Sequence, residues 1–400
     1  MLTTLNIVAS DVTLDTDYLV VGAGASSMAF VDELVAHTDA DVVIVDRRHA
    51  PGGHWIDAYP FVRLHQPSAY YGVNSLPLGD DRLQTSGTDA GFYERATGAE
   101  LVVYYQRVLD EVLLPTGRVR FLPMTDYRGG DGTEHVVSST LTGATTSIHV
   151  RRRVVDATYV ASEVPSRHHC AFGADDDARV VSPNDLPRLG DAASGFTILG
   201  AGKTAMDTCT WLLDAGVAPD DITWVRPRDG WFVDRAFTQP FEQAARMIEY
   251  QARLVEAVAH EPNGSAAAHR LETHGVFRRL DAGVEPEVFR GATLAAGELA
   301  PLREIEKVIR LGRVRHIGTS EVILDHGSIP SDARRVHVDC TAQGLATRRC
   351  SRSSGPTASA SSSPPSASPR GARQSSGTSK ASTSTTTSGT ASAHPCPAPA

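Results

Sequence analysis

The sequence has few cysteines, and none of them lie close together. Its 400 residues include five, which are Cys170, Cys209, Cys340, Cys350 and Cys396. Because no CxxC pair or zinc-ribbon spacing is present, dithiol redox chemistry and a structural zinc site of that kind are excluded. The run His168-His169-Cys170 consists of consecutive residues, which do not easily converge on one ion. The run Asp175 to Asp177 is more typical of a solvated loop than of a cation site. We therefore predict no metal site.

Basic residues and long apolar runs are also scarce. The chain has 38 Lys and Arg residues against 47 Asp and Glu residues, and all 47 acidic groups lie within the first 345 residues, against 32 basic ones. Nucleic acids and anionic membranes favour a basic surface, so neither is expected as a partner. No apolar run reaches about 18 residues, and Met1 to Asp17 has no basic segment ahead of its apolar stretch. These absences predict a cytoplasmic location.

A glycine-rich turn follows the first strongly apolar run of the chain. The run Asp17 to Val21 leads into Gly22-Ala-Gly24-Ala-Ser-Ser27, and a helical pattern and a second apolar run ending at Asp46 follow. Strand, turn, helix and strand in this order form a βαβ unit, which predicts a parallel sheet. Gly22 permits the tight turn, and Gly24 lets a diphosphate approach the backbone at the positive end of the helix. Ser27 is small enough for the close helix–strand packing required of the third position.

An acidic residue and a second glycine turn complete this pattern. Asp46 stands 22 residues beyond Gly24, where an acid accepts hydrogen bonds from an adenosine ribose; the alternative is an aspartate that only caps a loop. Arg47 follows directly, and Pro51-Gly52-Gly53-His54-Trp55 forms another element of close backbone approach. This second turn favours FAD over NAD. The residues expected to bind FAD are Gly22, Gly24, Ser27, Asp46, Arg47, Gly52, Gly53 and Trp55.

With these motifs the chain resembles the flavin-containing monooxygenases and related FAD- and NAD(P)-dependent oxidoreductases, over roughly residues 15 to 345. The resemblance implies that the Gly-Gly-x-Trp turn packs along the FAD and that the segment after it, Tyr59 to Pro67, runs beneath the flavin. His65 and Gln66 are then the candidate catalytic residues, since they could hydrogen-bond the reduced flavin or its oxygen adduct. The alternative is that both are loop residues facing water.

The opening pattern is repeated later in the chain, from Phe196 to Val225. Its turn reads Gly200-Ala-Gly202-Lys203-Thr204-Ala205, and small Ala205 in the third position is typical of NADP sites in two-dinucleotide flavoproteins. The next strand ends in Arg226-Pro-Arg228 instead of an acid. An acid there would hold a 2′-hydroxyl group, whereas an arginine can pair with a 2′-phosphate. NADPH is therefore predicted in preference to NADH; the alternative is that Arg226 and Arg228 are solvated surface charges. The residues expected to bind NADPH are Gly200, Gly202, Lys203, Thr204, Ala205, Arg226 and Arg228.

We predict an α/β fold of two Rossmann-like, doubly wound domains, with the NADPH domain inserted in the FAD domain. The predicted parts are the first part of the FAD-binding domain at 15–164, an NAD(P)-binding domain with a helical insertion at 178–330, a return segment of the FAD domain at 331–345, and a low-complexity tail at 346–400. The connector between the two domains is expected from Pro165 to Pro187. The tail contains no Val, Ile, Leu, Met, Phe, Tyr or Trp, so it cannot offset its ordering entropy and is expected to be disordered.

The origin of the tail stays open between a natural flexible segment and an out-of-frame translation of a GC-rich gene. The second explanation is favoured because the change in composition follows directly on a strand pattern, Val336 to Cys340. In two-dinucleotide flavoproteins the return strand is followed by a Gly-Asp turn against the ribityl chain of FAD. No Gly-Asp follows Gly344, so weak FAD retention is expected.

The predicted reaction is hydride transfer from NADPH to FAD, after which the reduced flavin passes electrons to oxygen and a small organic substrate. Two alternatives stay open: an NAD(P)H-dependent flavin reductase or oxidase that oxygenates nothing, and a C-terminally damaged, non-catalytic nucleotide-binding remnant. They stay open because the monooxygenase fingerprint Phe-x-Gly-x-x-x-His-x-x-x-Trp/Tyr is missing between Pro165 and Asp191, and because Tyr159 replaces the glycine of the Ala-Thr-Gly return motif. The sequence names neither the substrate nor the oligomeric state.

Overall fold

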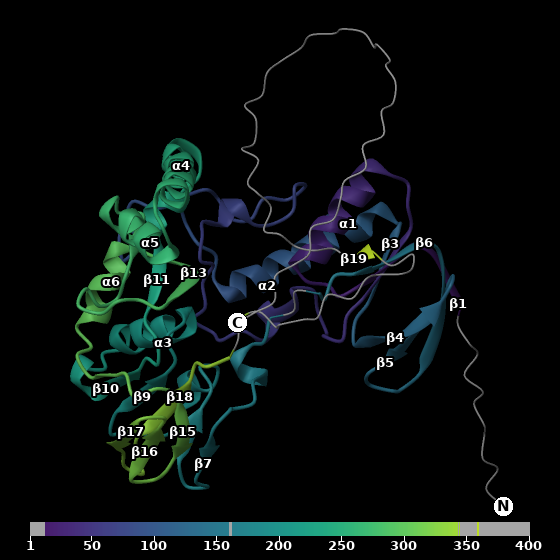
Figure 1. The fold of residues 1–400 in the computed structure, drawn as a ribbon. Coiled ribbons are helices and arrows are strands. Elements are labelled where there is room, and N and C mark those ends of the chain that lie inside the picture. The colour runs from purple at the N-terminus through teal and green to yellow at the C-terminus, as the bar shows by residue number, and fades with distance from the viewer. Residues whose placement is uncertain (1–12, 160–161, 343, 345–357, 360–400) are drawn as a thin grey trace, which may run out of the picture. The chain divides into compact units, whose positions relative to one another are not determined.

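The first sheet is built around the first βαβ unit (Figure 1). The structure is a computed structural model and describes residues 13–159, 162–342, 344 and 358–359. The strands of this sheet are β1 (Thr13–Val21), β2 (Val42–Val45), β3 (Val119–Leu122), β4 (Thr125–Asp131), β5 (Glu134–Ser139) and β6 (Thr145–Asp156), in the order β3-β2-β1-β6-β5-β4, with β19 (Ala358–Ser359) beside β6. Strands β3, β2, β1 and β6 pair in parallel, and β6, β5 and β4 pair antiparallel.

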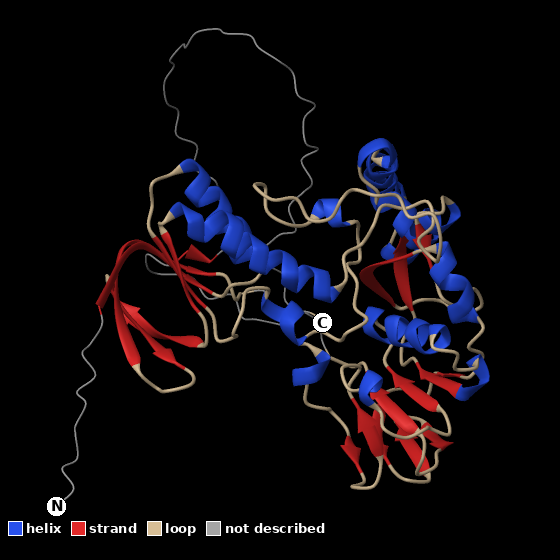
Figure 2. Cartoon of the chain, turned by 180° about the vertical axis from the view of Figure 1, so that it is seen from behind, coloured by secondary structure: helices blue, strands red, loops and turns tan. Residues whose placement is uncertain are grey.

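Both faces of β1 and β2 are buried, because alternate side chains enter two different clusters. Val20 and Ile44 pack with the helices α1 (Ala25–His37) and α2 (Gly98–Arg107), which lie along one face of the sheet (Figure 2). Leu19 and Val43 pack with Val137 of β5 and its neighbours. The α2 helix begins at a Thr97–Glu100 capping box and continues into η3 (Val108–Leu113, π-helical) and η4 (Leu114–Thr116). Two short 3-10 helices, η1 (Gly53–Asp57) and η2 (Ser68–Tyr70), follow β2.

The second sheet is fully parallel and has the order β14-β10-β9-β18-β8. Its strands are β8 (Arg179–Val181), β9 (Phe196–Leu199), β10 (Ile222–Val225), β14 (Val308–Ile309) and β18 (Val336–Asp339). Helix α3 (Lys203–Asp214) and η7 (Pro219–Asp221) connect β9 to β10. Ile198, Met206 and Trp224 are fully buried in the core that these elements share.

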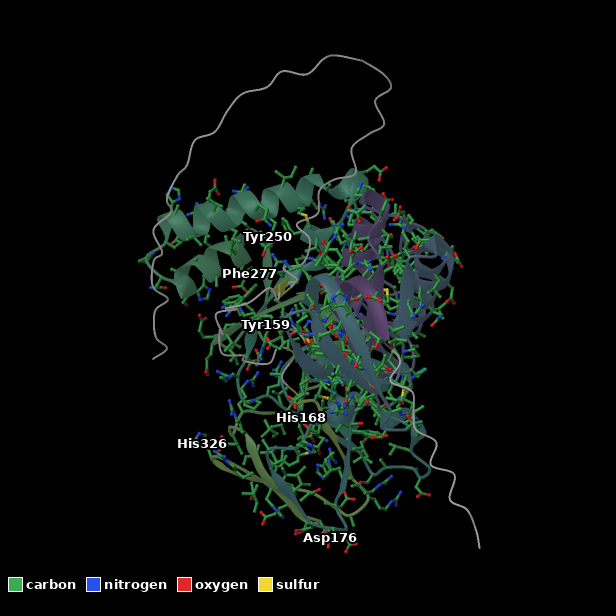
Figure 3. All side chains as sticks on the ribbon, turned by 90° about the vertical axis from the view of Figure 1, so that its right-hand side faces the viewer. Tyr159, His168, Asp176, Tyr250, Phe277 and His326 are labelled. Atoms are coloured by element: carbon green, nitrogen blue, oxygen red, sulfur yellow. The ribbon has the colours of Figure 1, made fainter. Side chains whose placement is uncertain are left out.

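Two smaller sheets and three helices accompany the second sheet. One sheet has the order β12-β11-β13, from β11 (Gly230–Asp234), β12 (Phe277–Arg278) and β13 (Val288–Leu294); the other has the order β17-β16-β15-β7, from β7 (Gly173–Ala174), β15 (Val314–Ile317), β16 (Glu321–Leu324) and β17 (Gly327–Pro330). The helices are α4 (Ala245–His260), α5 (Gly264–Thr273) and α6 (Ala296–Arg303), with short 3-10 turns η5 (Pro165–Arg167), η6 (Leu186–Arg188), η8 (Arg235–Thr238) and η9 (Phe241–Gln243). Tyr250 of α4 packs against the cluster that contains Trp231 and Phe277 (Figure 3).

The predicted α/β class with two Rossmann-like units is confirmed, but three boundaries were wrong. Strand β18 pairs with β9 and β8, so the expected return of 331–345 to the first sheet is not made by this strand. The connector expected from Pro165 to Pro187 contains β8, a strand of the second sheet. The sequence pattern favours a helix near Leu299 to Leu311, but α6 ends at Arg303 and Val308–Ile309 form β14. The predicted disorder of 346–400 lies outside the described residues, apart from Ala358–Ser359, which pair in parallel with β6.

Candidate functional site

The first glycine turn lies between the ends of β2 and β6. Gly22 has φ +97°, and its N–H donates to the carbonyl of Val45 at 2.8 Å. A Cβ on Gly22 would stand 2.9 Å from Cγ2 of Thr158, so no larger residue fits there. Helix α1 starts directly after Gly24, and no side chain caps its N-terminus. Its first N–H groups are therefore available to an anion.

The second glycine pair packs directly on this turn. The N–H of Gly52 donates to the carbonyl of Ala23 at 2.8 Å, and Gly52 has φ +127°. Gly53 has φ +59°, and its backbone approaches Gly24. Trp55 is partly buried against the core beside them. The predicted residues of the two turns are thus brought together by backbone contact.

Asp46 holds the first turn in place from the end of β2. It is 6% exposed, and its carboxylate accepts hydrogen bonds from the backbone N–H groups of Ala23 at 2.6 Å and of Arg48 at 2.8 Å. Gly22, Asp46 and Arg47 line a cavity of about 560 Å³, here named the first cavity. Ser27 does not reach this cavity; it is fully buried, and its hydroxyl has no hydrogen-bond partner among the described residues. Its small size serves packing.

The second glycine turn is tight at its first glycine and open at its second. Gly200 has φ +124°, and a Cβ there would stand 2.8 Å from the carbonyl oxygen of Cys340. Gly202 precedes α3, and no atom of the described chain lies within 4 Å of the position that its Cβ would take. Ala205 is fully buried in the core below the turn. The open side of Gly202 therefore leaves room for a ligand against the helix N-terminus.

The ammonium group of Lys203 is held by two carboxylates. Nζ lies 2.5 Å from Oδ1 of Asp207 and also contacts the carboxylate of Glu298, and the side chain is only 6% exposed. Lys203, which the sequence places among the residues expected to bind the coenzyme, thus has a paired and buried ammonium group. Thr204 lies beside it.

A second cavity, of about 920 Å³, brings the two halves of the predicted site together. From the segment after β2 it is lined by His54, Trp55, Tyr59 and His65, and from the second turn by the residues 200–204. Gln66 is not among the lining residues. Of the two candidate catalytic residues, only His65 thus faces the same cavity as the second glycine turn.

Two histidines and a tyrosine of this cavity are kept neutral. Burial, with the positive charge of Lys203, lowers the pKa of His65 to about 4, and burial, with the charge of Arg48, does the same for His54. The hydroxyl of Tyr59 donates to Asp207 at 2.7 Å, and burial together with that carboxylate raises the pKa of Tyr59 well above its ordinary value. Near neutral pH the cavity therefore offers two neutral imidazoles and a neutral phenol.

Arg226 is buried and is not among the lining residues of the second cavity. It is 3% exposed, its guanidinium lies over the ring of Trp224 at 4.8 Å, and it stands 3.5 Å from the carboxylate of Asp229. Burial lowers its pKa. The prediction that Arg226 binds the 2′-phosphate is not supported by this position, because the side chain is enclosed in protein.

Arg228, in contrast, lines the second cavity. Three arginines from distant segments line it as well: Arg290 of β13, and Arg313 and Arg315 beside and within β15. Burial, with the charge of Arg228, lowers the pKa of Arg290. No local motif marks Arg290, Arg313 or Arg315 in the sequence, since they lie more than 80 residues beyond Gly202.

Comparison with known proteins identifies a related domain model and similar folds. A family model of an NAD(P)-binding Rossmann-like domain matches residues 20–77. The open crystal structure of cyclohexanone monooxygenase is similar with a TM-score of 0.51 and 15% identity, covering 83% of this chain and 74% of that one. The chain has the fold of the flavin monooxygenases. A cyclohexanone-bound structure of the same enzyme matches equally, with a TM-score of 0.51, 16% identity and coverage of 84% and 73%.

Two mycobacterial relatives have higher identity. Uncharacterized proteins of Mycobacterium tuberculosis (strain ATCC 25618 / H37Rv) and Mycobacterium bovis are each 44% identical over 337 residues, which are 84% of this chain. The chain spans 62% of the length of these relatives. Among the described residues, no helix is long and apolar enough to cross a membrane, and no group of three or more His, Cys, Asp or Glu side chains could hold a metal ion.

Proposed function

We propose that the chain is an FAD-dependent oxidoreductase that is reduced by NADPH and acts, like a monooxygenase, on a small organic substrate in the cytoplasm. The observation that carries this proposal is the second cavity, which is lined both by the segment after the Gly-Gly-x-Trp turn and by the second glycine turn. Hydride transfer requires that the two cofactors meet in one enclosed space. In this proposal residues 15–164 bind FAD and residues 178–330, together with β18, bind NADPH.

The residues of the first turn fit an FAD molecule. The uncapped N-terminus of α1 at Gly24 suits a diphosphate, and Asp46 lines the first cavity, where a ribose hydroxyl could donate to its carboxylate. Gly22 lines this cavity with bare backbone, and the N–H of Gly52 holds the neighbouring Ala23. Trp55 lines the second cavity, where the isoalloxazine ring system would lie beside it.

The residues of the second turn fit NADPH. The space at Gly202 and the N–H groups at the start of α3 would hold its diphosphate. Arg228 and Arg290 both line this cavity, and no ion pair to a carboxylate is found for either within the described chain. Such a pair suits the dianionic 2′-phosphate.

FAD, when bound, supplies the group that accepts hydride and later donates electrons to oxygen. The protein's part is to position and to shield. His65 stays neutral, so its imidazole offers one donor and one acceptor to a ligand in the cavity. Tyr59 stays protonated and uses its proton on Asp207, which holds this wall of the cavity against α3.

The test is coenzyme oxidation by the purified chain with added FAD. We expect NADPH to be oxidised faster than NADH and oxygen to be consumed, and a panel of small ketones, amines and sulfides should include one that incorporates labelled oxygen. Peroxide as the sole product with every substrate would identify a flavin reductase or oxidase that oxygenates nothing. No NADPH oxidation under any substrate or oxygen condition would exclude the proposed function and favour a non-catalytic remnant.

A further inference from the structure

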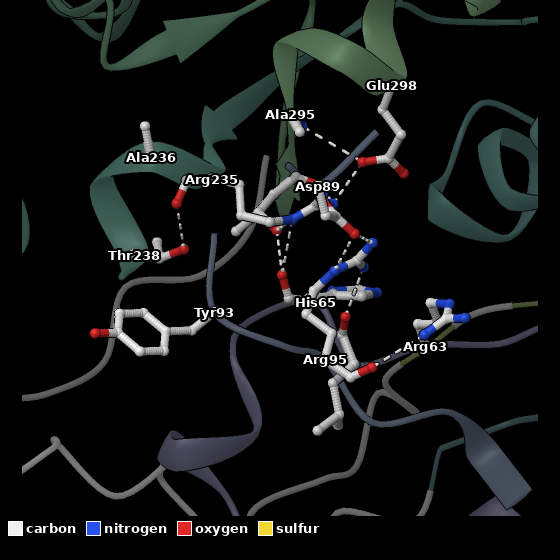
Figure 4. A network of polar contacts seen from close by, with 12 residues as sticks. Arg63, His65, Asp89, Tyr93, Arg95, Arg235, Ala236, Thr238, Ala295 and Glu298 are labelled. Atoms are coloured by element: carbon white, nitrogen blue, oxygen red, sulfur yellow. Dashed lines mark hydrogen bonds and ion pairs between the residues drawn. The ribbon is translucent and has the colours of Figure 1, made fainter. Parts of the chain in front are cut away.

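A buried network of charges lies behind the wall of the second cavity (Figure 4). Arg235 is fully buried, and its guanidinium pairs both with Asp89 and with Glu298. Asp89 also pairs with Arg95, whose Nη2 lies 2.5 Å from Oδ2. Glu298 pairs in addition with Lys203 of the second glycine turn.

The members of this network come from four separate segments. Asp89 and Arg95 lie between η2 and α2, Arg235 follows β11, Glu298 belongs to α6, and Lys203 opens α3. With Asp207, three cations face three carboxylates, so the buried charges balance. Buried ions are tolerated only when they are paired in this way.

Two guanidinium groups of the network hold adjacent carbonyl groups of the cavity wall. Nη1 of Arg95 donates to the carbonyl of Leu64 at 2.8 Å. Nε of Arg235 lies 3.4 Å from the carbonyl of His65, which also accepts a hydrogen bond from the hydroxyl of Thr293. Since Asp89 bridges the two arginines, the backbone of Leu64 and His65 is fixed by a single rigid unit.

We propose that Arg235, Asp89 and Arg95 are positioning residues that fix His65 in the second cavity. Through Glu298 and Lys203, the same unit ties that segment to the first turn of α3, so the flavin-side wall and the coenzyme turn keep a set spacing. The role of Lys203 is therefore to make this connection, and not to bind phosphate. The catalytic consequence rests on the proposed function, whereas the positioning itself does not.

The charges of the network also act on the His65 ring. Besides burial, the positive charges of Lys203, Arg235 and Arg95 lower the pKa of His65. If the charged residues of the network served only to fill space, apolar residues could replace them. A protein often stays equally stable when well-packed apolar side chains replace a buried ion pair. Hydrogen bonds to two neighbouring carbonyl groups, in contrast, require donors in a set geometry.

The experiment compares the FAD-reconstituted full chain with its Arg235→Met variant by amide hydrogen exchange and by anaerobic flavin reduction with NADPH. We expect exchange in residues 62–66 to rise by about tenfold or more while residues 18–31 keep their protection. The rate of flavin reduction should fall by about 10- to 100-fold, with the NADPH dissociation constant within about threefold of the parent. The control is Arg278→Met, which removes a neighbouring ion pair with Asp234 that does not reach this segment.

Unchanged exchange in residues 62–66, or a uniform rise over the whole chain, overturns the positioning role. If Arg235→Met does not fold, Glu298→Gln is the second variant; it keeps the side-chain shape, and a smaller local rise in exchange is expected. If the parent chain is not reduced by NADPH, the proposed function fails, but the exchange data still decide whether the network positions His65.

Discussion

A Cβ placed on Gly53 would stand 2.9 Å from the Cα of Gly24. These glycines lie 29 residues apart, at the ends of consecutive segments of the first βαβ unit, and their backbones meet without a side chain between them. The close approach of the second turn therefore requires that Gly53 and Gly24 both lack a side chain at this point, independently of any ligand.

Gly53→Ala should lower both stability and FAD affinity. The added methyl group collides with Gly24 at a backbone angle of φ +59°. Gly132→Ala is a matched control, because Gly132 has φ +57° but no atom within 4 Å of its Cβ position. In the control, the free energy of unfolding should fall by about 1 kcal/mol from backbone strain alone. In Gly53→Ala, the free energy of unfolding should fall by roughly 2 kcal/mol more than in the control, and the affinity for FAD should fall tenfold or more. Thermal unfolding and flavin titration measure both effects, and equal losses would contradict the contact.

Gly202→Ala should weaken NADPH binding without loss of stability. Its φ of −91° suits any residue, and the Cβ would enter open space. We expect an unchanged melting temperature and a fall of about tenfold in NADPH affinity, because the methyl group occupies the space proposed for the diphosphate. Gly200→Ala should instead unfold at lower temperature, since its Cβ meets the carbonyl of Cys340. NADPH affinity unaltered by Gly202→Ala would place the diphosphate elsewhere.

Coenzyme choice should depend on Arg228 and Arg290. Replacing either with alanine should reduce the preference for NADPH over NADH by about tenfold, which corresponds to about 1.4 kcal/mol for a lost charged contact. Arg226→Ala should instead lower stability, because it empties a site against Trp224 and leaves Asp229 with less compensation. Steady-state kinetics with both coenzymes, beside melting temperatures, separate the two effects. If Arg226→Ala or Arg226→Glu lost the preference for NADPH while its melting temperature stayed unchanged, Arg226 would be identified as the ligand of the 2′-phosphate.

The stability of the chain should fall between pH 6.5 and pH 4. His337 of β18 is 1% exposed, and burial with the charge of Arg335 lowers its pKa from 6.5 to about 4. As the pH falls, His337 is therefore protonated in the unfolded chain before it is protonated in the folded chain, so the free energy of unfolding decreases across this window. Above pH 6.5 the stabilisation from neutral, buried His337 is fully present. His54 and His65 act in the same direction.

His337→Gln should remove about 1–3 kcal/mol of this pH-dependent loss. Denaturant unfolding at pH 7 and pH 4.5 measures it. The control Ile198→Val, in the paired strand β9, should lower stability by about 1 kcal/mol at both pH values. A pH dependence in His337→Gln equal to that of the parent would show that His337 does not titrate in this window.

The motifs predicted from the sequence were local, and their geometry is as expected. Gly22 and Gly200 both end a strand with positive φ, and α1 and α3 both start directly behind the second glycine. The sheet in which β18 lies could not be predicted, since a four-residue strand carries no information about its pairing partner. The difference between Arg226 and Arg228 was equally hidden. The N–H of Arg226 continues the ladder to Ile309, which buries the residue, whereas Arg228 lies beyond the ladder and reaches the cavity.

The sequence by itself determined the two strand–turn–helix–strand units, because tight turns and hydrophobic periodicity depend on residues within about 30 positions of one another. Only the tertiary structure decided which charges meet. Lys203 lies 95 residues from Glu298, and Arg235 lies 146 residues from Asp89. A lysine at a glycine turn can bind a ligand or a buried carboxylate, and the choice depends on which partners the fold brings close to it. A lysine that becomes buried must pair with an opposite charge.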